Sequence, residues 1–198
     1  MVKLVITDDN GLPSHLGGHE NETHVDIGAL SFLVEKFDVK TVIDVGCGPG
    51  GMVKVGRELG LDYIGVDGDF TVERASEVQP YVTIHDFTKE PPLFKTSDGS
   101  EVFDLGWTVE FLEHVDAHYI YNFMKTLRQC KYVICTHAFP GQPGHHHVNC
   151  REHPYWVDIF TAFGFEVDVE TTNQVRDKST MAERYIRQQS LVFKNRNL

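Results

Sequence analysis

A run of apolar residues that passes directly into closely spaced glycines most constrains how this chain can fold. Positions 42–51 read Val-Ile-Asp-Val-Gly-Cys-Gly-Pro-Gly-Gly. β-Branched residues favour a strand, and glycines permit a tight turn and a close approach of the backbone to a ligand. A helix that begins after such a turn offers free N–H groups and the positive end of its dipole. The segment therefore predicts a nucleotide-type pocket at the carboxyl end of a strand.

Two spacing patterns describe this turn. Gly46, Gly48 and Gly51 fit the dinucleotide-binding pattern G-x-G-x-x-G. Asp44, followed by Gly46, Gly48 and Gly50, fits an acid-x-G-x-G-x-G pattern. Because a glycine pattern alone is weak evidence, residues further along the chain must separate the two.

Acidic residues also follow the next two predicted strands. Asp67 comes directly after the apolar run at 63–66, where a carboxylate can accept two hydrogen bonds from a ribose diol. Dinucleotide-binding enzymes carry an acid at a similar place, so Asp67 alone does not decide. The run at 81–84 is followed by His85, Asp86 and Phe87. An acid at a strand end is more often a helix cap, so these residues carry weight only as an ordered set.

The ordered set resembles the class I S-adenosylmethionine (SAM)-dependent methyltransferases. In that family the acid before the glycine turn helps to hold the amino-acid part of SAM. An acid and an aromatic residue after the third strand bind adenine, and Asp86 and Phe87 occupy these places here. The segment at 108–115, Thr-Val-Glu-Phe-Leu-Glu-His-Val, is similar to one that follows the fourth strand in small-molecule methyltransferases. Carried over position by position, the resemblance implies cofactor contacts from Asp44, Gly46, Cys47, Gly48, Gly50, Asp67, Gly68, Asp86, Phe87, Thr108 and Glu110.

The resemblance implies a Rossmann-like three-layer α/β sandwich with a seven-stranded, mostly parallel sheet and an antiparallel last strand. The apolar periods agree, because alternating strands and helices produce a parallel sheet covered on both faces. We expect one methyltransferase domain over residues 26–198, preceded by an extension over 1–25 that can act as a lid. We also expect a short helix at 70–78, and final strands at 165–169 and 190–193 with no helix between them.

Histidines are the candidates for the chemistry at the methyl acceptor. SAM carries an activated methyl group, so the enzyme must align the acceptor and, for a hydroxyl, supply a base. Histidine titrates near neutrality, and loops at the carboxyl ends of strands hold ligands in open α/β sheets. The loop after the predicted strand at 133–135 contains His145, His146 and His147, and His114 follows the fourth strand.

We expect His147 to be the base, with His145 on the same side of an extended loop and His114 as a further candidate. A plain solvated loop is the competing interpretation. Side chains of consecutive residues diverge, so we expect no metal site in this run. A second group, His15, His19 and His24, lies in the N-terminal extension.

Composition limits the partners and the compartment. The net charge of −11 disfavours a protein that holds a nucleic-acid backbone. No apolar run is long enough to span a membrane, and residues 1–9 lack a signal-peptide core. The cysteines form no CxxC pair, which favours reduced thiols. We expect a cytoplasmic protein that acts on a small-molecule acceptor and binds neither nucleic acid nor a membrane.

Several methyltransferase subclasses lack their motifs here. Residues 108–111 contain neither the Asp/Asn-Pro-Pro-aromatic motif of amino-methylating DNA enzymes nor the Pro-Cys nucleophile of cytosine-C5 enzymes. The segment 145–165 is similar to methyltransferases associated with sugar and surface-glycan pathways. We therefore expect O-methylation of a sugar, a nucleotide sugar or a related hydroxyl compound. The alternatives are a non-catalytic SAM-binding regulatory module and an NAD-dependent oxidoreductase, and Asp86 with Phe87 argues against the second.

Overall fold

A computed structural model describes residue 7 and residues 11–198 of the chain. The expectations for residues 1–6 and 8–10, the absent signal-peptide core and the start of the N-terminal extension, lie outside the described residues. Within the described residues the strands form one seven-stranded sheet in the order β3-β2-β1-β4-β5-β7-β6. The strands are β1 (Thr41–Val45), β2 (Asp62–Asp67), β3 (Val82–Ile84), β4 (Phe103–Thr108), β5 (Cys130–Cys135), β6 (Phe165–Val167) and β7 (Leu191–Asn195).

The directions of the strands confirm the predicted sheet. Strands β1 to β5 pair in parallel, whereas β7 runs antiparallel to both β5 and β6. Strand order reverses on either side of β1, where β2 lies on one side and β4 on the other. Open α/β sheets bind ligands outside the carboxyl ends of strands at such a switch point. The topology therefore places a candidate site at the ends of β1, β2 and β4.

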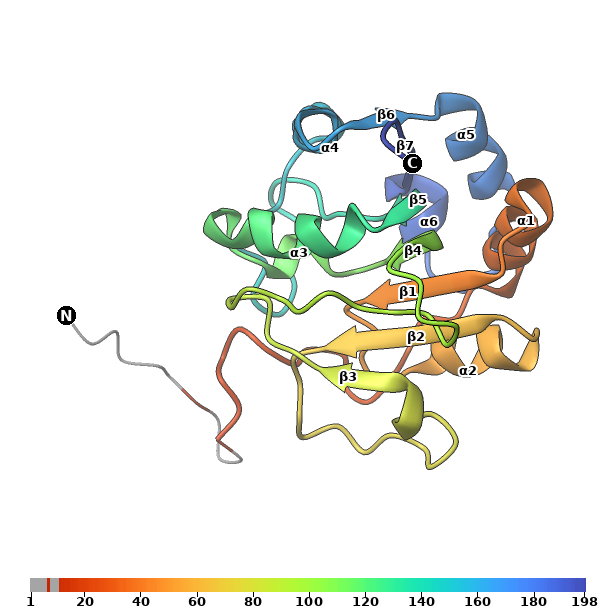
Figure 1. Cartoon of the computed structure of the whole chain (residues 1–198). Coiled ribbons are helices and arrows are strands. Elements are labelled where there is room, and N and C mark those ends of the chain that lie inside the picture. Colours follow the sequence, from red (N-terminus) through yellow and green to blue (C-terminus); the bar gives the residue numbers. More distant parts are fainter. Residues whose placement is uncertain (1–6, 8–10) are drawn as a thin grey trace.

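Helices cover both faces of the sheet, as Figure 1 shows. The α-helices are α1 (Ile27–Phe37), α2 (Gly51–Glu58), α3 (Ile120–Leu127), α4 (His153–Ala162), α5 (Val169–Lys178) and α6 (Tyr185–Gln189), and the short 3₁₀ segments are η1 (Gln79–Tyr81), η2 (Leu112–His114) and η3 (Ala117–Tyr119). Side chains of α3 and α4 pack into one apolar cluster, and side chains of α1, α2, α5 and α6 pack into another. Each cluster combines side chains of the sheet with side chains of the helices on one face, as the predicted three-layer sandwich requires. No helix among the described residues is long and apolar enough to cross a membrane.

The first helix begins where the sequence predicted the domain to begin. The side chain of Asp26 caps α1 by accepting a hydrogen bond of 2.8 Å from the backbone N–H of Ala29. The same carboxylate accepts a hydrogen bond of 2.9 Å from the N–H of Thr180, in the connection between α5 and α6. Asp26 is fully buried, so this cap also fastens the start of the domain to its C-terminal part.

Two local expectations are wrong. No helix covers residues 70–78, where a turn leads into η1. Asp69 accepts a hydrogen bond from the N–H of Thr71, and Arg74 donates to the carbonyl of Asp69. Such side-chain bonds to the local backbone replace helical ones.

The second error concerns the last strands, because α5 and α6 lie between β6 and β7. The strand expected at 165–169 ends at Val167, since Asp168 caps α5 by accepting from the N–H of Thr171. The buried side of α5 consists of Thr171, Thr172 and Val175. A helix whose buried face carries two threonines shows little apolar periodicity, so the sequence did not reveal it.

The segment before α1 runs across the edge of the sheet at which β1, β2 and β3 end. In Figure 1 this segment is the red and orange coil on the side toward which the arrows of β1 and β2 point. Thr7 forms an isolated bridge with Pro13, and Leu12 is buried. The described part of the extension therefore packs on the domain at the predicted ligand-binding edge.

Candidate active site

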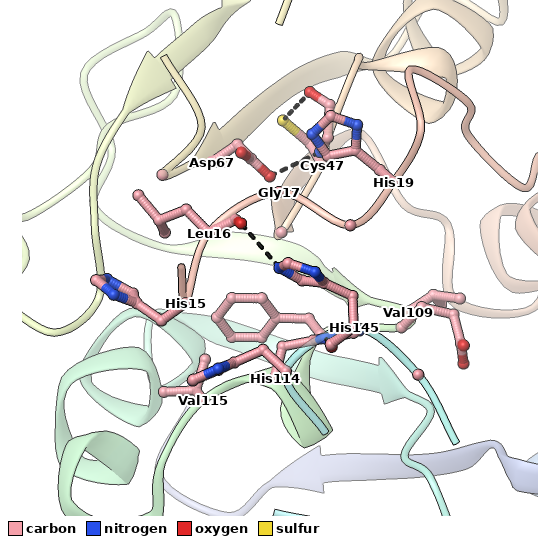
Figure 2. A pocket seen from close by; sticks show the side chains of 18 of the residues that line it. His15, Leu16, Gly17, His19, Cys47, Asp67, Val109, His114, Val115 and His145 are labelled. Atoms are coloured by element: carbon pink, nitrogen blue, oxygen red, sulfur yellow. Dashed lines mark hydrogen bonds between the residues drawn. The ribbon is translucent and has the colours of Figure 1, made fainter. Parts of the chain in front are cut away.

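A cavity of about 740 Å³ opens at the carboxyl ends of β1, β2 and β4. The glycine turn and the ends of β2 and β3 line one side, which we call the cofactor side. The segment after β4 and the histidine loop after β5 line the other, which we call the acceptor side. Residues 14–20 and 22–24 also line the cavity, and Figure 2 shows Leu16 between Asp67 on the cofactor side and His145 on the acceptor side.

The backbone of the glycine turn requires glycine. Gly46, Gly48 and Gly50 have φ angles of 83°, 51° and 87°, in the left-handed region that glycine adopts most readily. A Cβ on Gly46 would also lie 2.5 Å from the ring of Phe111. The turn therefore brings its backbone close to the cavity and packs directly on the segment that follows β4.

Asp67 is held against this turn at the end of β2. One carboxylate oxygen accepts a hydrogen bond of 2.8 Å from the N–H of Gly48, and the other accepts one of 2.7 Å from the N–H of Asp69. Burial raises the pKa of Asp67, although these two bonds oppose the rise. Each carboxylate oxygen has a further lone pair, so Asp67 can still accept hydrogen bonds from a ligand diol.

Arg74 fixes the geometry of the cofactor side, and sequence reasoning missed it. Its Nε donates to the carbonyl of Gly48 at 3.0 Å, and both terminal nitrogens donate to the carbonyl of Asp69 at 3.1 Å. The guanidinium also lies 3.6 Å from the carboxylate of Asp67. Arg74 is buried and so clamps the glycine turn to the loop after β2. An isolated arginine in an irregular segment gave no signal in the sequence.

Asp44 lies beneath the turn. It is buried, and the hydroxyl of Tyr63 donates to its carboxylate at 3.3 Å. Burial raises the pKa of Asp44 well above its ordinary value, and the charge of Asp67 adds to the rise, while the bond from Tyr63 opposes it. Asp44 reaches the cavity, where it can hold a polar, cationic group of a ligand.

Asp86 and Phe87 lie beyond the end of β3, and both line the cavity. Asp86 accepts from the N–H of Thr88 at 2.8 Å and lies 3.2 Å from Nε2 of His15. Burial alone would raise the pKa of Asp86, but the bonds from Thr88 and His15 lower it from its ordinary value. The ring of Phe87 packs edge-on against Phe111, with 5.6 Å between ring centroids.

The N-terminal segment is bonded to both sides of the cavity. Nδ1 of His19 accepts a hydrogen bond from the N–H of Asn21, so its Nε2 carries the proton that is donated to Asp69 at 3.0 Å. Thr23 accepts from the N–H of Gly51 at 3.1 Å, at the first residue of α2. His145 donates from Nε2 to the carbonyl of Leu16 at 3.0 Å. Figure 2 shows this last bond crossing the cavity.

The acceptor side holds two histidines with the same tautomer. His114 donates from Nδ1 to the carbonyl of His145 at 2.7 Å, and His147 donates from Nδ1 to the carbonyl of Gln142 at 3.0 Å. Their rings meet edge to face, with 4.9 Å between centroids. Burial lowers the pKa of His114 to about 4, so this ring is neutral at pH 7. In the neutral form of each ring, the tautomer that these bonds select has its lone pair on Nε2.

Two glutamates complete the acceptor side. Glu110 exchanges hydrogen bonds with Thr136: its N–H donates to the threonine oxygen, which in turn donates to the carboxylate at 3.0 Å. Burial raises the pKa of Glu110 to about 7. Glu113 is fully buried, and neither carboxylate oxygen has a hydrogen-bond partner among the described residues. Burial, and then the charge of Glu110, raise the pKa of Glu113 well above its ordinary value.

Three of these groups have the arrangement of metal ligands. One ligand atom from each of Glu113, His114 and His147 lies within 4.8 Å of the other two. We expected no metal from the sequence, because the run of consecutive histidines was the only candidate ligand set there. Glu113 and His114 come from η2 and His147 from the loop after β5, and sequence spacing gives no measure of that approach.

The structure brings together most of the predicted site residues. All three predicted catalytic histidines and most of the predicted cofactor contacts line the cavity, whereas Gly50 and Thr108 do not. Gly50 is the N-cap of α2 behind the turn, and Thr108 is fully buried at the end of β4. The expected extended loop is also wrong, because residues 145 and 146 form a turn and His146 has a φ of 46°. His145 therefore does not share the environment of His147.

Comparison with solved structures identifies the fold. A TehB-like SAM-dependent methyltransferase from Corynebacterium glutamicum superimposes with a TM-score of 0.60 at 14% identity, covering 86% of this chain and 89% of that one. The methyltransferase domain of bacterial CtHen1-C gives 0.56 at 17% identity over 85% and 95% of the two chains. Magnesium protoporphyrin IX methyltransferase from Synechocystis PCC 6803, solved with bound SAM, gives 0.54 at 15% identity over 83% and 74%. No family model and no curated protein sequence matches the chain. The chain has the fold of the class I SAM-dependent methyltransferases.

Proposed function

We propose that this protein is a SAM-dependent methyltransferase that methylates a hydroxyl group of a small molecule, with a sugar as the first candidate. One observation carries the proposal: a single cavity joins a cofactor side built around Asp67 to an acceptor side with two histidines whose Nδ1 atoms donate to backbone carbonyls. SAM supplies a methyl group already activated on a sulfonium. The protein has to hold that cofactor, orient the acceptor and receive its proton.

The cofactor side suits a nucleoside without phosphates. Asp67 would bind the ribose diol, Asp86 the exocyclic amine of adenine and Asp44 the amino-acid part of SAM. The N–H of Gly51, where the pyrophosphate of a dinucleotide would need the free start of a helix, is already bonded to Thr23. A Cβ on Gly51 would lie 2.7 Å from the same threonine. This occupied helix start disfavours the alternative of an NAD-dependent oxidoreductase.

The acceptor side suits a hydroxyl rather than an amine. An amine can attack the methyl group after losing its proton to water, whereas a hydroxyl needs a base or a cation. Nε2 of His147 is the group that would take this proton when no cation is bound, because its Nδ1–H is already donated to Gln142. Glu110 and Tyr185, which are not on the cofactor side, also line the cavity. This space for an acceptor disfavours the alternative of a non-catalytic regulatory module.

The polar character of that space supports a sugar as the first candidate acceptor. Glu110 and His147 provide hydrogen-bond acceptors, while Phe111 and Tyr185 provide apolar ring surfaces. Sugars present hydroxyl donors around a ring with apolar C–H faces, and this combination suits such a lining.

Two measurements test the proposal. Calorimetry should show binding of SAM and of S-adenosylhomocysteine and none of NAD. A SAM-consumption screen with nucleotide sugars, free sugars, phenols, quinones and amines should give a methylated product for a hydroxyl compound, identified by mass spectrometry. Binding of NAD without SAM would contradict the cofactor assignment, and turnover confined to amines would contradict the hydroxyl assignment.

A further inference from the structure

The Glu113–His114–His147 cluster on the acceptor side is not explained by methyl transfer alone. We propose that these three side chains bind one divalent transition-metal cation, with open coordination positions toward the acceptor. Two imidazoles and one carboxylate are a recurrent ligand set for catalytic zinc and for other first-row divalent cations. Cation binding stands independently of the proposed function, whereas a role for the cation in activating the acceptor rests on it.

The two imidazoles are already oriented as metal ligands. Histidines that bind metals nearly always donate their other ring N–H to a carbonyl or a carboxylate, which fixes the tautomer. His114 and His147 both do so, to the carbonyls of His145 and Gln142. Two histidines that share this arrangement, with rings 4.9 Å apart, point to one common ligand for the two Nε2 atoms.

The carboxylate of Glu113 supplies an independent observation. Its side chain is fully buried, and both oxygens lack a hydrogen-bond partner among the described residues. A buried carboxylate without a partner is costly, and native structures normally provide a hydrogen-bond donor, a counter-charge or a metal. A divalent cation held with His114 and His147 would supply the missing partner.

The two segments that carry the ligands are fastened to each other. The N–H groups of Val148 and Asn149 both donate to the carbonyl of Glu113 at 3.0 Å. The bond from His114 to the carbonyl of His145 joins the same two segments. Because the backbone is held in this way, the ligand atoms need only side-chain rotation to move from within 4.8 Å to the separation of about 3–3.5 Å that a cation with bonds of about 2.1 Å imposes.

A bound cation would take over the task of the base. It would bind the acceptor hydroxyl and lower its pKa. The hydroxyl proton would pass to water, the oxygen would form a bond to the methyl carbon, and the carbon–sulfur bond would break with its electron pair remaining on sulfur. In this arrangement His147 acts as a ligand and not as a proton acceptor.

The competing explanation is loose binding of metal by the consecutive histidines. The structure separates the two, because His145 is bonded to Leu16 and His146 lies in a turn near His15 rather than in the cluster. Substitution His146→Asn is a suitable control, since asparagine tolerates a positive φ.

Metal binding is tested on the full-length protein after treatment with a chelator. Titration with Co²⁺, followed by visible absorption, and with Zn²⁺, followed by calorimetry, should each show one site per chain. Variants E113Q and H147A should lose at least about 100-fold in affinity, because removal of even outer-shell partners costs about 10–100-fold. H146N should bind as the wild type does. No stoichiometric site, or an equal loss in H146N, would overturn the proposal.

Two further readouts keep the result interpretable. Zn²⁺ should raise the thermal midpoint of the wild type, and circular dichroism should show that E113Q and H147A are folded. SAM affinity should be the same with and without the cation. Methyl transfer that proceeds unchanged in the chelator-treated protein would overturn the role of the cation in activating the acceptor and leave the proposed function intact. Cation binding without methyl transfer to any acceptor would leave the site intact and contradict the function.

Discussion

The cofactor side and the acceptor side of the cavity meet across a few side chains, yet the protein builds them in different ways. On the cofactor side, the acids lie in or just beyond the ends of neighbouring strands, as Asp67 is the last residue of β2. On the acceptor side, ligand groups come from η2 and from a distant loop, joined by backbone bonds to Glu113. The first design follows from sheet topology and the second from tertiary contacts, so the two should respond differently to substitution.

The largest expected effect separates chemistry from cofactor binding. H147A should lower turnover by about 10²–10⁴-fold, which is the range for loss of a group that removes a proton. If His147 is a metal ligand, the decrease in turnover should be at least as large. SAM affinity should be unchanged, because His147 contacts the acceptor side only. Calorimetry and single-turnover assays measure the two quantities separately.

The control for this variant is H118A, whose side chain is 89% exposed and bonded to Asp116. It should retain full turnover. If H147A lost SAM affinity in proportion to its turnover, the division of the cavity into two sides would be wrong at this residue.

The next effect concerns the cofactor side. D67A should weaken SAM by about 10–100-fold, because each charge-assisted hydrogen bond contributes about 1.5–3 kcal/mol and some of this is recovered by water. Turnover at saturating SAM should change far less than the affinity. D62A, at the other end of β2 and bonded to Arg57, is the matched control and should bind SAM normally. Equal affinity in D67A would remove Asp67 from the site.

The difference between the two sides also explains what the sequence revealed. A strand that ends in an acid is a local pattern, so most of the residues predicted to contact a cofactor line the cavity, while Gly50 and Thr108 lie behind its lining. Arg74 was missed because its partners are backbone carbonyls that a sequence does not show. Glu113 was quoted as part of a motif and not as a ligand, because neither its burial nor the approach of His147 follows from spacing.

A smaller effect is expected at Arg74, which acts through the turn and does not need to touch the ligand. R74A should weaken SAM by about tenfold, and R74K should restore little of this, because an ammonium cannot reproduce the planar fork that bonds Gly48 and Asp69. K54A is the control, since Lys54 lies on α2 and pairs with Glu77 at the surface. Full recovery in R74K would show that charge, and not geometry, is what the turn needs.

The smallest expected effect tests whether the N-terminal segment belongs to both sides. Residues 11–24 are bonded to Asp69 on the cofactor side and to His145 on the acceptor side. SAM should therefore protect this segment from protease, as the predicted lid requires. H19A removes the hydrogen bond to Asp69, and such a bond contributes about 0.5–1.5 kcal/mol net, so SAM should bind only a few-fold more weakly. H145A should leave SAM binding almost unchanged but increase cleavage near Leu16, because only the bond to the acceptor side is lost. Equal protease sensitivity with and without SAM in the wild type would contradict a lid, and the segment would then be a fixed part of the cavity wall.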